Sequence, residues 1–353
     1  MKKLLFTGGG TAGHVTPNLA LIRYFKMKGH EIHYVGTKSG IEKQLVKSEG
    51  VIYHEIEAGK LRRYFDMQNI KDSVKVLKGF IDAKKVLRKV KPDIVFSKGG
   101  FVTPPVVWAA YFKRIPTVIH ESDISPGLAN KLAIPFAKKI CYSFPETKKY
   151  LKDKKSVFTG IPIREELKIG NKEKGKKFCK FTDNKPILLI IGGSQGAKAI
   201  NETTRDILDK LLHTFNVCHI CGKGEKDEKF ESKKGYCQFE YIKNEIADVF
   251  MATDFAVSRA GATTLFEFLE IGIASLLIPL PKKVSRGDQI LNAESFKKQG
   301  FCNVLYEEKL NSQTLYMKII ETYKRKDKII KNIKHSGIKN GLKKTVEIIE
   351  SIY

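Results

Sequence analysis

The residue with the clearest chemical potential near the start of the chain is His14. It follows the glycine-rich turn from Gly8 to Gly13, and that turn follows the apolar run KKLLFT. A strand, a glycine turn and a helix in this order gather backbone N–H groups and the positive end of a helix dipole, which suit a phosphate or another anion. An imidazole at such a helix start can reach a reacting hydroxyl or a phosphate, although many histidines are purely structural.

The same turn has the spacing of the dinucleotide fingerprint, Gly8-x-Gly10-x-x-Gly13. That fingerprint also needs an acidic residue at the end of the second strand to hold a ribose hydroxyl, and EIHYVG is followed by Thr37 instead. A second glycine turn, GGSQG at 192–196, lacks the spacing altogether. The pattern therefore argues against NAD and favours a nucleotide-activated substrate held by phosphate-binding turns.

Polar side chains cluster after further apolar runs in both halves of the chain. The carboxyl ends of parallel strands meet at one edge of a sheet, so we expect these clusters to converge on a cleft. The first half contributes SKGGFVTPP (97–105) and HESDISPGLANK (120–131), and the second half contributes SRAGATTLFEF (258–268) and RGDQILNAE (286–294). Glu267 lies among apolar neighbours within a predicted helix, which is unusual for a merely solvated charge.

Neither the cysteines nor the carboxylates have the spacing of metal ligands. Cys218 and Cys221 resemble half a zinc site, but residues three apart in a strand point to opposite faces. Cys237 has no second cysteine at zinc spacing, and no D-x-D occurs to hold a cation on a diphosphate. We therefore predict structural thiols, no metal site and no cofactor.

Short apolar strands alternate with helical segments twice along the chain, after KKLLFT and again after PILLII. This order predicts an α/β fold of two Rossmann-like domains facing across a cleft. The expected domains are 1–163 and 164–353, with the polar stretch 168–185 as a connecting loop. The C-terminal segment reads as basic amphipathic helices, the last of which is free to return to the first domain.

Length and composition agree with a two-domain globular protein. The chain has 353 residues, 42% hydrophobic and 29% charged, which excludes collagen-like, disordered and disulfide-scaffold classes. The N-terminal apolar run is too short for a signal peptide, and no run approaches the ~18 to 20 residues of a membrane helix. We expect the six cysteines to be reduced and the protein to be cytoplasmic.

The chain carries a formal charge of +26, of which residues 1–160 contribute +17. Such a field attracts nucleic acid, acidic lipid or phosphorylated substrates, unless it reflects only a lysine-rich surface. In the segment 70–92, apolar residues at helical spacing (Ile70, Val74, Leu77 and Ile81) are surrounded by lysines and arginines. This stripe predicts either an ordinary core face or a helix that lies on an anionic membrane.

Seven motifs together resemble the MurG family of bacterial UDP-N-acetylglucosamine transferases, which complete lipid II in peptidoglycan synthesis. They are GGGTAGHVTPNLAL, FSKGGFVTPPVV, HESDISPGLANK, TGIPIR, IGGSQGAKAIN, SRAGATTLFE and GDQILNA, in this order. The resemblance implies two Rossmann-like domains, with the membrane face and acceptor site on the first and the nucleotide sugar on the second. It also implies a metal-independent transfer that inverts the anomeric configuration.

The resemblance further assigns roles to individual residues. The positions expected to contact UDP-GlcNAc are Thr11, Ala12, Gly13, Arg164, Ser194, Ile242, Ala262, Thr263, Thr264, Leu265, Phe266, Glu267 and Gln289. Among these, Ile242 would meet the uracil, Glu267 the ribose hydroxyls and Gln289 the sugar. Asp123 and Asn130 would lie on the acceptor side. His14 is the first candidate for the base that takes the acceptor proton, followed by Glu121 and His120.

The resemblance implies transfer of N-acetylglucosamine to a lipid-linked muramyl peptide at the cytoplasmic face of the membrane, with the protein bound peripherally. Two departures bear on this expectation: Ala12 stands where the family more often has glycine, and HESD replaces HEQN. The second departure keeps open a transferase that acts on diacylglycerol or another lipid. A basic nucleic-acid-binding protein is the remote alternative, but it predicts aromatic and basic residues interleaved along a groove, and no such pattern occurs.

Overall fold

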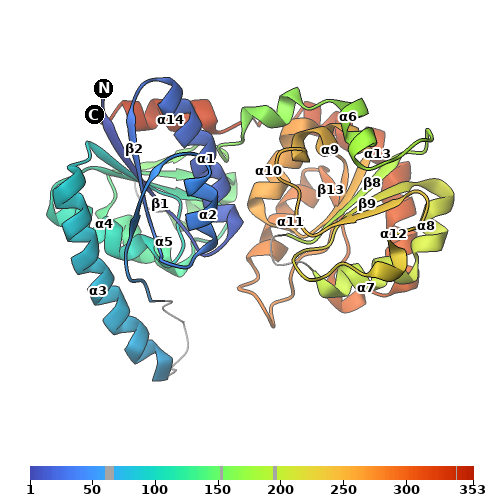
Figure 1. Cartoon of the computed structure of the whole chain (residues 1–353), viewed down its shortest axis with the longest axis horizontal. Helices are drawn as coiled ribbons and strands as arrows, with labels where there is room; N and C mark the ends of the chain where they lie inside the picture. Colours follow the sequence, from blue (N-terminus) through green and yellow to red (C-terminus); the bar gives the residue numbers. More distant parts are fainter. Residues whose placement is uncertain (60–66, 152–153, 194–196, 339) are drawn as a thin grey trace. The chain divides into compact units, whose positions relative to one another are not determined.

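The computed structural model describes residues 1–59, 67–151, 154–193, 197–338 and 340–353. The chain divides into two compact units, Met1–Arg164 with Lys339–Tyr353, and Glu165–Ile338. The expected boundary after residue 163 lies one residue before this division. Residues 339–353, which the prediction counted with the second domain while leaving their return open, belong to the first unit (Figure 1).

The first unit is a parallel sheet covered by helices on both faces. Within the described residues its strands lie in the order β3-β2-β1-β4-β5-β6-β7. The strands are β1 (Lys3–Thr7), β2 (Glu31–Gly36), β3 (Ile52–Glu55), β4 (Ile94–Ser97), β5 (Thr117–Glu121), β6 (Lys139–Tyr142) and β7 (Ser156–Phe158). The helices are α1 (Ala12–Met27), α2 (Ile41–Lys47), α3 (Met67–Val90), α4 (Thr103–Phe112), α5 (Leu128–Ala133) and α14 (Leu342–Glu350).

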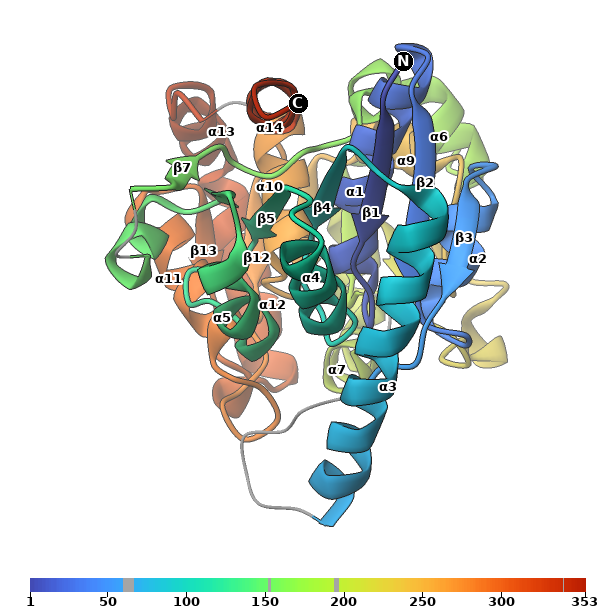
Figure 2. The same ribbon diagram turned by 90° about the vertical axis from the view of Figure 1, so that its left-hand side faces the viewer.

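Successive side chains along a strand point to opposite faces of the sheet, so the core of this unit has one part on each face. Leu4 and Phe6 pack against α1 and α14, whereas Leu5 packs against α3 and α4. Figure 2 shows α3, α4 and α5 together in front of the sheet and α1 behind it. Because both faces are covered, a strand such as β5 (TVIHE) is buried along its whole length.

The second unit repeats this plan with the strand order β10-β9-β8-β11-β12-β13 in the described residues. The strands are β8 (Ile187–Ile191), β9 (Asn216–Ile220), β10 (Tyr236–Phe239), β11 (Phe255–Ser258), β12 (Ser275–Leu277) and β13 (Cys302–Val304). The helices are α6 (Lys172–Phe178), α7 (Lys198–Asp206), α8 (Leu208–Thr214), α9 (Ile246–Ala252), α10 (Ala262–Ile271), α11 (Asp288–Lys298), α12 (Ser312–Lys324) and α13 (Lys326–Lys334). Short 3₁₀ helices connect them: η1 (Ile134–Phe136) and η2 (Pro145–Tyr150) in the first unit, and η3 (Glu165–Ile169), η4 (Glu228–Phe230) and η5 (Glu307–Lys309) in the second.

The prediction of two Rossmann-like parallel sheets is confirmed, and one local prediction is corrected. The expected loop 168–185 contains α6, which Asn171 caps by accepting from the Lys174 N–H.

Helix α3 buries a different face from the one its sequence stripe suggested. Val76, Ala83, Leu87 and Val90 form its core face. Val74, Leu77 and Ile81 are 64%, 62% and 48% exposed, so the interpretation of this stripe as core is wrong. The side chain of Ile70, the other member of the stripe, lies outside the described residues. Within the described chain, no helix is both long enough and apolar enough to cross a bilayer.

Candidate active site

In the first unit the site is centred where the strand order reverses, between β1 and β4. The chain leaves β1 toward one edge of the sheet and leaves β4 toward the other, which opens a crevice at their carboxyl ends. The two loops pack backbone against backbone, with the Gly9 N–H donating to the Gly99 carbonyl at 3.3 Å. Gly100 has a φ of +89°, and a Cβ there would overlap the Gly9 carbonyl oxygen. Only glycine allows this close approach.

His14 is held in one orientation at the start of α1. Its Nδ1 atom lies 3.1 Å from the Gly9 carbonyl oxygen and 3.1 Å from Thr11 Oγ1. A carbonyl can only accept, so Nδ1 carries the proton and the lone pair of the neutral ring is on Nε2. The ring is half-buried. This is the tautomer that a general base requires.

The predicted residues Thr11, Ala12 and Gly13 lie beside His14, as expected from their spacing. Thr11 is the N-cap of α1, and Ala12 and Gly13 occupy its first turn. No acidic side chain lies in that turn to offset the positive end of the helix dipole. The arrangement suits an anionic group of a substrate.

Glu42 supports the glycine turn from the neighbouring helix, α2, and the sequence reasoning missed it. Its carboxylate accepts from the Gly10 N–H at 3.3 Å, from the Thr37 N–H at 3.0 Å and from Thr37 Oγ1 at 2.6 Å. The side chain is fully buried. The sequence signal for this residue was an acidic side chain shortly after the second strand. In the structure its carboxylate bonds to the protein's own turn.

Glu121 lies at the end of β5 and orders the second polar loop. Its carboxylate accepts from the N–H groups of Asp123 (3.0 Å) and Gly127 (3.1 Å) and from Asn130 Nδ2 (2.8 Å). Burial, followed by the nearby Asp123 carboxylate, raises the pKa of Glu121. A carboxylate already bonded to three donors of its own loop is suited to holding that loop rather than to taking a substrate proton.

Lys98, at the end of β4, is a second residue that the sequence reasoning did not single out. It is 1% exposed, and its ammonium group bonds to Ser122 Oγ. Burial lowers the pKa of Lys98 to about 8, although the Glu121 and Asp123 carboxylates oppose this shift. A lysine directly after the apolar run IVFS was the available signal, since lysines are rarely buried without a partner.

His120 is the least accessible of the three base candidates. It is 0% exposed, its Nε2 lies 2.8 Å from the Gly160 carbonyl oxygen, and burial followed by the Lys98 charge lowers its pKa well below the usual value. Asn130 is also buried and donates to Glu121, whereas Asp123 is half-buried and accepts from Thr147 Oγ1 through its carbonyl. Of the histidines and carboxylates predicted in this unit, His14 has the orientation that a base needs.

In the second unit the strand order reverses between β8 and β11. The segment after β8 includes Ser194, a predicted UDP contact that lies outside the described residues. The turn after β11 ends at Gly261, the N-cap of α10. Of the predicted run along α10, Ala262, Thr263 and Thr264 form its first turn, and Leu265 and Phe266 are buried in the core. Like the start of α1, this helix start suits an anionic group.

Two amides of α11 support the loop before α10. Gln289 Oε1 accepts from the N–H groups of Ala260 (3.3 Å) and Leu280 (3.1 Å). Asn292 Nδ2 donates to the Ala260 carbonyl at 3.4 Å. Gln289, the predicted sugar contact, therefore lies at the carboxyl ends of β11 and β12 and ties their loops together.

Three further residues predicted to contact UDP-GlcNAc, Glu267, Ile242 and Arg164, lie in different parts of the fold. Glu267 is in the second turn of α10 and 7% exposed. Ile242 is buried in the connection between β10 and α9. Arg164 is the last residue of the first unit and half-buried. Among the described residues, three side chains lie close enough together to share a metal ion. They are Cys179, Cys218 and Cys237, and they lie away from these edges.

Comparison with known families and proteins agrees with this architecture. Residues 4–142 match the glycosyltransferase family 28 N-terminal domain, and residues 187–350 match the glycosyltransferase family 28 C-terminal domain. The crystal structure of Acinetobacter baumannii MurG has a TM-score of 0.76 and 25% identity, covering 99% of this chain and 100% of that one.

Two curated relatives are similar over their whole length. Both are UDP-N-acetylglucosamine--N-acetylmuramyl-(pentapeptide) pyrophosphoryl-undecaprenol N-acetylglucosamine transferases. The one from Clostridium tetani is 54% identical, covering 100% of this chain and 98% of its own, and the one from Clostridium botulinum strain Langeland is 55% identical, covering 99% of both. The chain therefore belongs to glycosyltransferase family 28, in the MurG group of UDP-N-acetylglucosamine transferases.

Proposed function

We propose that the chain transfers N-acetylglucosamine from UDP-GlcNAc to undecaprenyl-diphosphoryl-N-acetylmuramyl-pentapeptide (lipid I) and so forms lipid II. The observation that carries this function is the 54–55% identity, over essentially whole chains, to transferases whose names state this reaction. The two switch-point loops support it, because each presents a helix start to an anionic group.

His14 is the base of the proposed reaction. The acceptor sugar hydroxyl must lose its proton as the new glycosidic bond forms, and Nε2 of His14 has the lone pair to take it. The Gly9 carbonyl accepts from Nδ1–H and stabilises the imidazolium that results. The bond from the anomeric carbon to the UDP oxygen breaks on the opposite side, so the configuration inverts.

The second unit holds the donor in this proposal. The first turn of α10 receives the diphosphate, Glu267 contacts the ribose hydroxyls, Ile242 contacts the uracil and Gln289 contacts the sugar. Arg164 and the segment that includes Ser194 supply further hydrogen-bond donors to the departing UDP. Fixed N–H donors and an arginine stabilise the charge that develops on UDP. The sequence contains no D-x-D pair that would hold a metal ion for this step.

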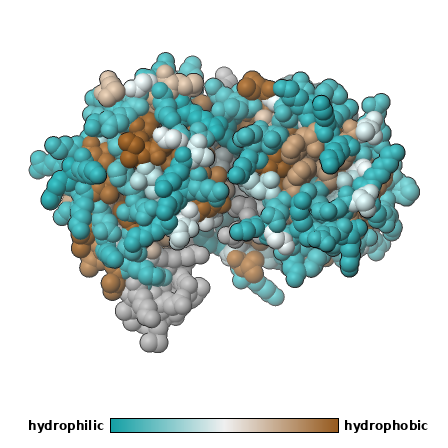
Figure 3. Space-filling view, viewed as in Figure 1, coloured by the Kyte–Doolittle hydropathy of each residue, from teal (hydrophilic) through white to brown (hydrophobic). Residues whose placement is uncertain are grey.

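The exposed face of α3 is the proposed membrane contact. Val74, Leu77 and Ile81 form an apolar ridge, and Phe112 of α4, 68% exposed, adjoins it through a ring contact of 5.8 Å with Phe80. Figure 3 shows apolar side chains gathered along this part of the first unit. Exposed Lys75, Lys78, Lys84, Lys85, Arg88 and Lys89 flank the ridge. An apolar ridge among basic residues suits the anionic cytoplasmic face of a membrane, where the lipid acceptor resides.

One incubation distinguishes the proposed acceptor from its rivals. We expect radiolabel from UDP-GlcNAc to enter lipid I and not diacylglycerol; label in diacylglycerol alone would favour the alternative lipid acceptor. UDP should raise the melting temperature and NADH should not. Stabilisation by nucleic acid but not by UDP would favour the remote alternative.

A vesicle experiment tests the membrane contact. We expect the protein to sediment with anionic vesicles, less so with neutral ones, and less as salt rises because exposed charges are screened over about 8 to 10 Å. Leu77→Glu with Lys78→Glu should reduce sedimentation without changing UDP affinity. Met317→Glu with Lys318→Glu, the same change on exposed α12, serves as the control. Equal sedimentation of the α3 variant and the parent would contradict the assignment of this face.

A further inference from the structure

Three thiols that are far apart in the sequence meet in the second unit. Cys179 directly follows α6, Cys218 is in the middle of β9, and Cys237 is in β10. Their Sγ atoms all lie within 4.8 Å of one another. The prediction that Cys237 has no cysteine partners is therefore wrong, because its partners are distant along the chain.

Strand register and an aromatic contact produce this meeting. Cys218 and Cys237 are direct partners in the parallel pairing of β9 and β10. Phe239, two residues after Cys237 and so on the same face, stacks on Phe178 with ring centroids 4.9 Å apart. That stack holds the end of α6, and with it Cys179, over the two strand cysteines.

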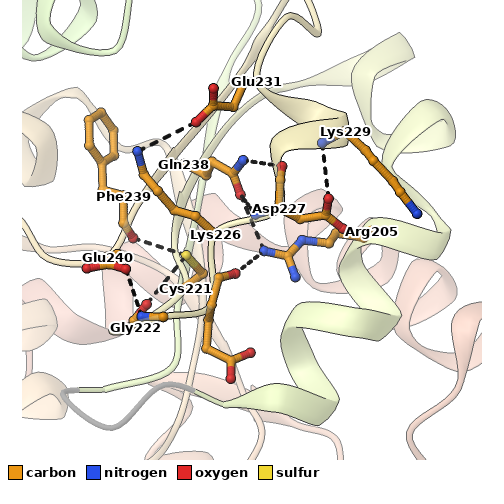
Figure 4. A network of polar contacts seen from close by, with 12 residues as sticks. Arg205, Cys221, Gly222, Lys226, Asp227, Lys229, Glu231, Gln238, Phe239 and Glu240 are labelled. Carbon is orange, nitrogen blue, oxygen red and sulfur yellow. Dashed lines mark hydrogen bonds and ion pairs between the residues drawn. The ribbon is translucent and has the colours of Figure 1, made fainter.

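The nearby residues of the C-H-I-C segment do not share this cluster. His219 points to the other face of the sheet, where its ring nitrogens lie 2.9 Å from Asn201 Oδ1 and 2.9 Å from Tyr236 Oη. Cys221 directs its sulfur to the Phe239 carbonyl at 3.3 Å, within a separate polar network (Figure 4). The expectation that Cys218 and Cys221 do not form a chelating pair is confirmed.

The geometry suits a bound ion better than a disulfide. A zinc ion with bonds of about 2.3 Å holds thiolates about 3.8 to 4.0 Å apart, so small side-chain adjustments close the cluster around it. Paired residues of adjacent parallel strands keep their Cβ atoms near the strand spacing of about 4.8 Å, whereas a disulfide prefers about 3.8 Å. A disulfide would also leave the third thiol unused.

We propose that Cys179, Cys218 and Cys237 bind one thiophilic metal ion, with Zn²⁺ as its natural form. On binding, the three S–H bonds ionise and three protons pass to solvent, which leaves a site of net charge −1. Cys237 is the partly exposed member, so it offers the route by which an ion enters.

The role of the ion is to attach α6 to the β9–β10 side of the sheet. Cys218 lies two residues before the end of β9, on a face of the sheet and not at its carboxyl edge. The ion therefore takes no part in glycosyl transfer, and this inference is independent of the proposed function. It adds a structural metal to a unit whose first helix has only seven residues.

The test uses the full chain, purified under reducing conditions and freed of metal. We expect Zn²⁺ to bind at one ion per chain, to protect the partly exposed Cys237 from a thiol reagent and to raise the melting temperature by about 5 °C or more. Cd²⁺ should produce a thiolate charge-transfer band in the ultraviolet. Each of Cys179→Ser, Cys218→Ser and Cys237→Ser should weaken Zn²⁺ binding about 100-fold or more.

Cys302→Ser, at a buried cysteine of β13 in the same unit, is the matched control and should bind Zn²⁺ like the parent. Retained UDP binding shows that each variant is folded. The parent protein provides a test that needs no variant: a Cys237 thiol that reacts as fast in excess Zn²⁺ as without it, with no Cd²⁺ band, would overturn the proposal. A disulfide between Cys218 and Cys237 in protein purified without a reductant would also overturn it.

Discussion

The two switch points of the chain have the same topology but are held together by different chemistry. In the first unit, the loops after β1, β4 and β5 are ordered by the buried ionisable groups Glu42, Lys98 and Glu121. In the second unit, the loops after β11 and β12 are ordered by the neutral amides of Gln289 and Asn292 and by the buried guanidinium of Arg259, which donates to the Ile278 carbonyl at 3.1 Å and pairs with Glu307. A common fold therefore does not imply a common response to pH or to a change of charge.

The physical reason is the cost of burying charge. A buried carboxylate can accept several N–H bonds at once and holds its loop strongly, but its hold depends on its protonation state. An amide makes fewer bonds and does not titrate. The loop support of the first switch point should therefore depend on pH more strongly than the amide support of the second.

The largest effect is expected at His14. His14→Ala should lower kcat by about 100-fold or more, because proton transfer from the acceptor hydroxyl loses its base. Steady-state kinetics with radiolabelled UDP-GlcNAc and lipid I measure this change. The control is His335→Ala, since Nδ1 of His335 also lies close to a backbone carbonyl oxygen, that of Lys331 at 2.7 Å. A loss confined to KM would instead make His14 a diphosphate-binding residue.

The next effect concerns pH and Lys98. Folding lowers its pKa from 10.5 to about 8, so between these values the unfolded chain holds a proton that the folded chain has released. The contribution of Lys98 to the free energy of unfolding therefore rises with pH through this window, by about 3 kcal/mol in all. Lys98→Met should remove this rise in urea denaturation measured from pH 7.5 to 10.5. Lys138→Met, at an exposed lysine, should keep it. Identical pH profiles of the free energy of unfolding for the parent and Lys98→Met would show that Lys98 does not make the stability of the first unit depend on pH.

A third prediction concerns the donor side. Glu267→Ala should weaken UDP binding by about 1.5 to 3 kcal/mol, because charge-assisted bonds to the ribose are lost. Isothermal titration calorimetry measures the affinity, and Glu202→Ala at an exposed glutamate of α7 is the control. Unchanged UDP affinity in a folded Glu267→Ala protein would remove Glu267 from the donor site.

The smallest effects come from exchanging the two kinds of loop support. Glu121→Gln should lower the free energy of unfolding by about 1 to 2 kcal/mol, because one amide oxygen cannot replace a carboxylate that accepts from three donors. Gln289→Glu retains an acceptor for both of its N–H partners and should cost less. Urea denaturation compares the two variants. A greater loss in Gln289→Glu would reverse the contrast between the units.

Much of the fold was predictable, because strand and helix periodicity are local properties of a sequence. The alternation of apolar runs and helical segments predicted both parallel sheets, and the glycine turns marked both switch points. Short strands without a strong apolar run, such as β3 (IYHE), were missed, and so was α6, whose sequence is mostly lysine. Packing against neighbours stabilises these elements, and their own sequences carry little signal of it.

The candidate site shows the same division. Its edges, its glycine turns and His14 were predictable from the strand–turn–helix order. The support from Glu42 and Lys98 was not, because each acts on a loop that is distant in the chain. The stripe on α3 was recognised, but the sequence could not distinguish its exposed face from the core face that includes Val76 and Leu87.

The sequence by itself determined the two-sheet α/β architecture, the positions of the phosphate-type turns and membership of a transferase family, since these depend on periodicity and on ordered motifs. Only the tertiary structure decided the tautomer of His14, the burial of His120 and Lys98, the exposure of the α3 ridge and the meeting of Cys179 with Cys218 and Cys237. Each of these depends on which distant segments pack together. Burial, hydrogen-bond partners and pKa values arise from that packing and are not encoded in the local pattern of residues.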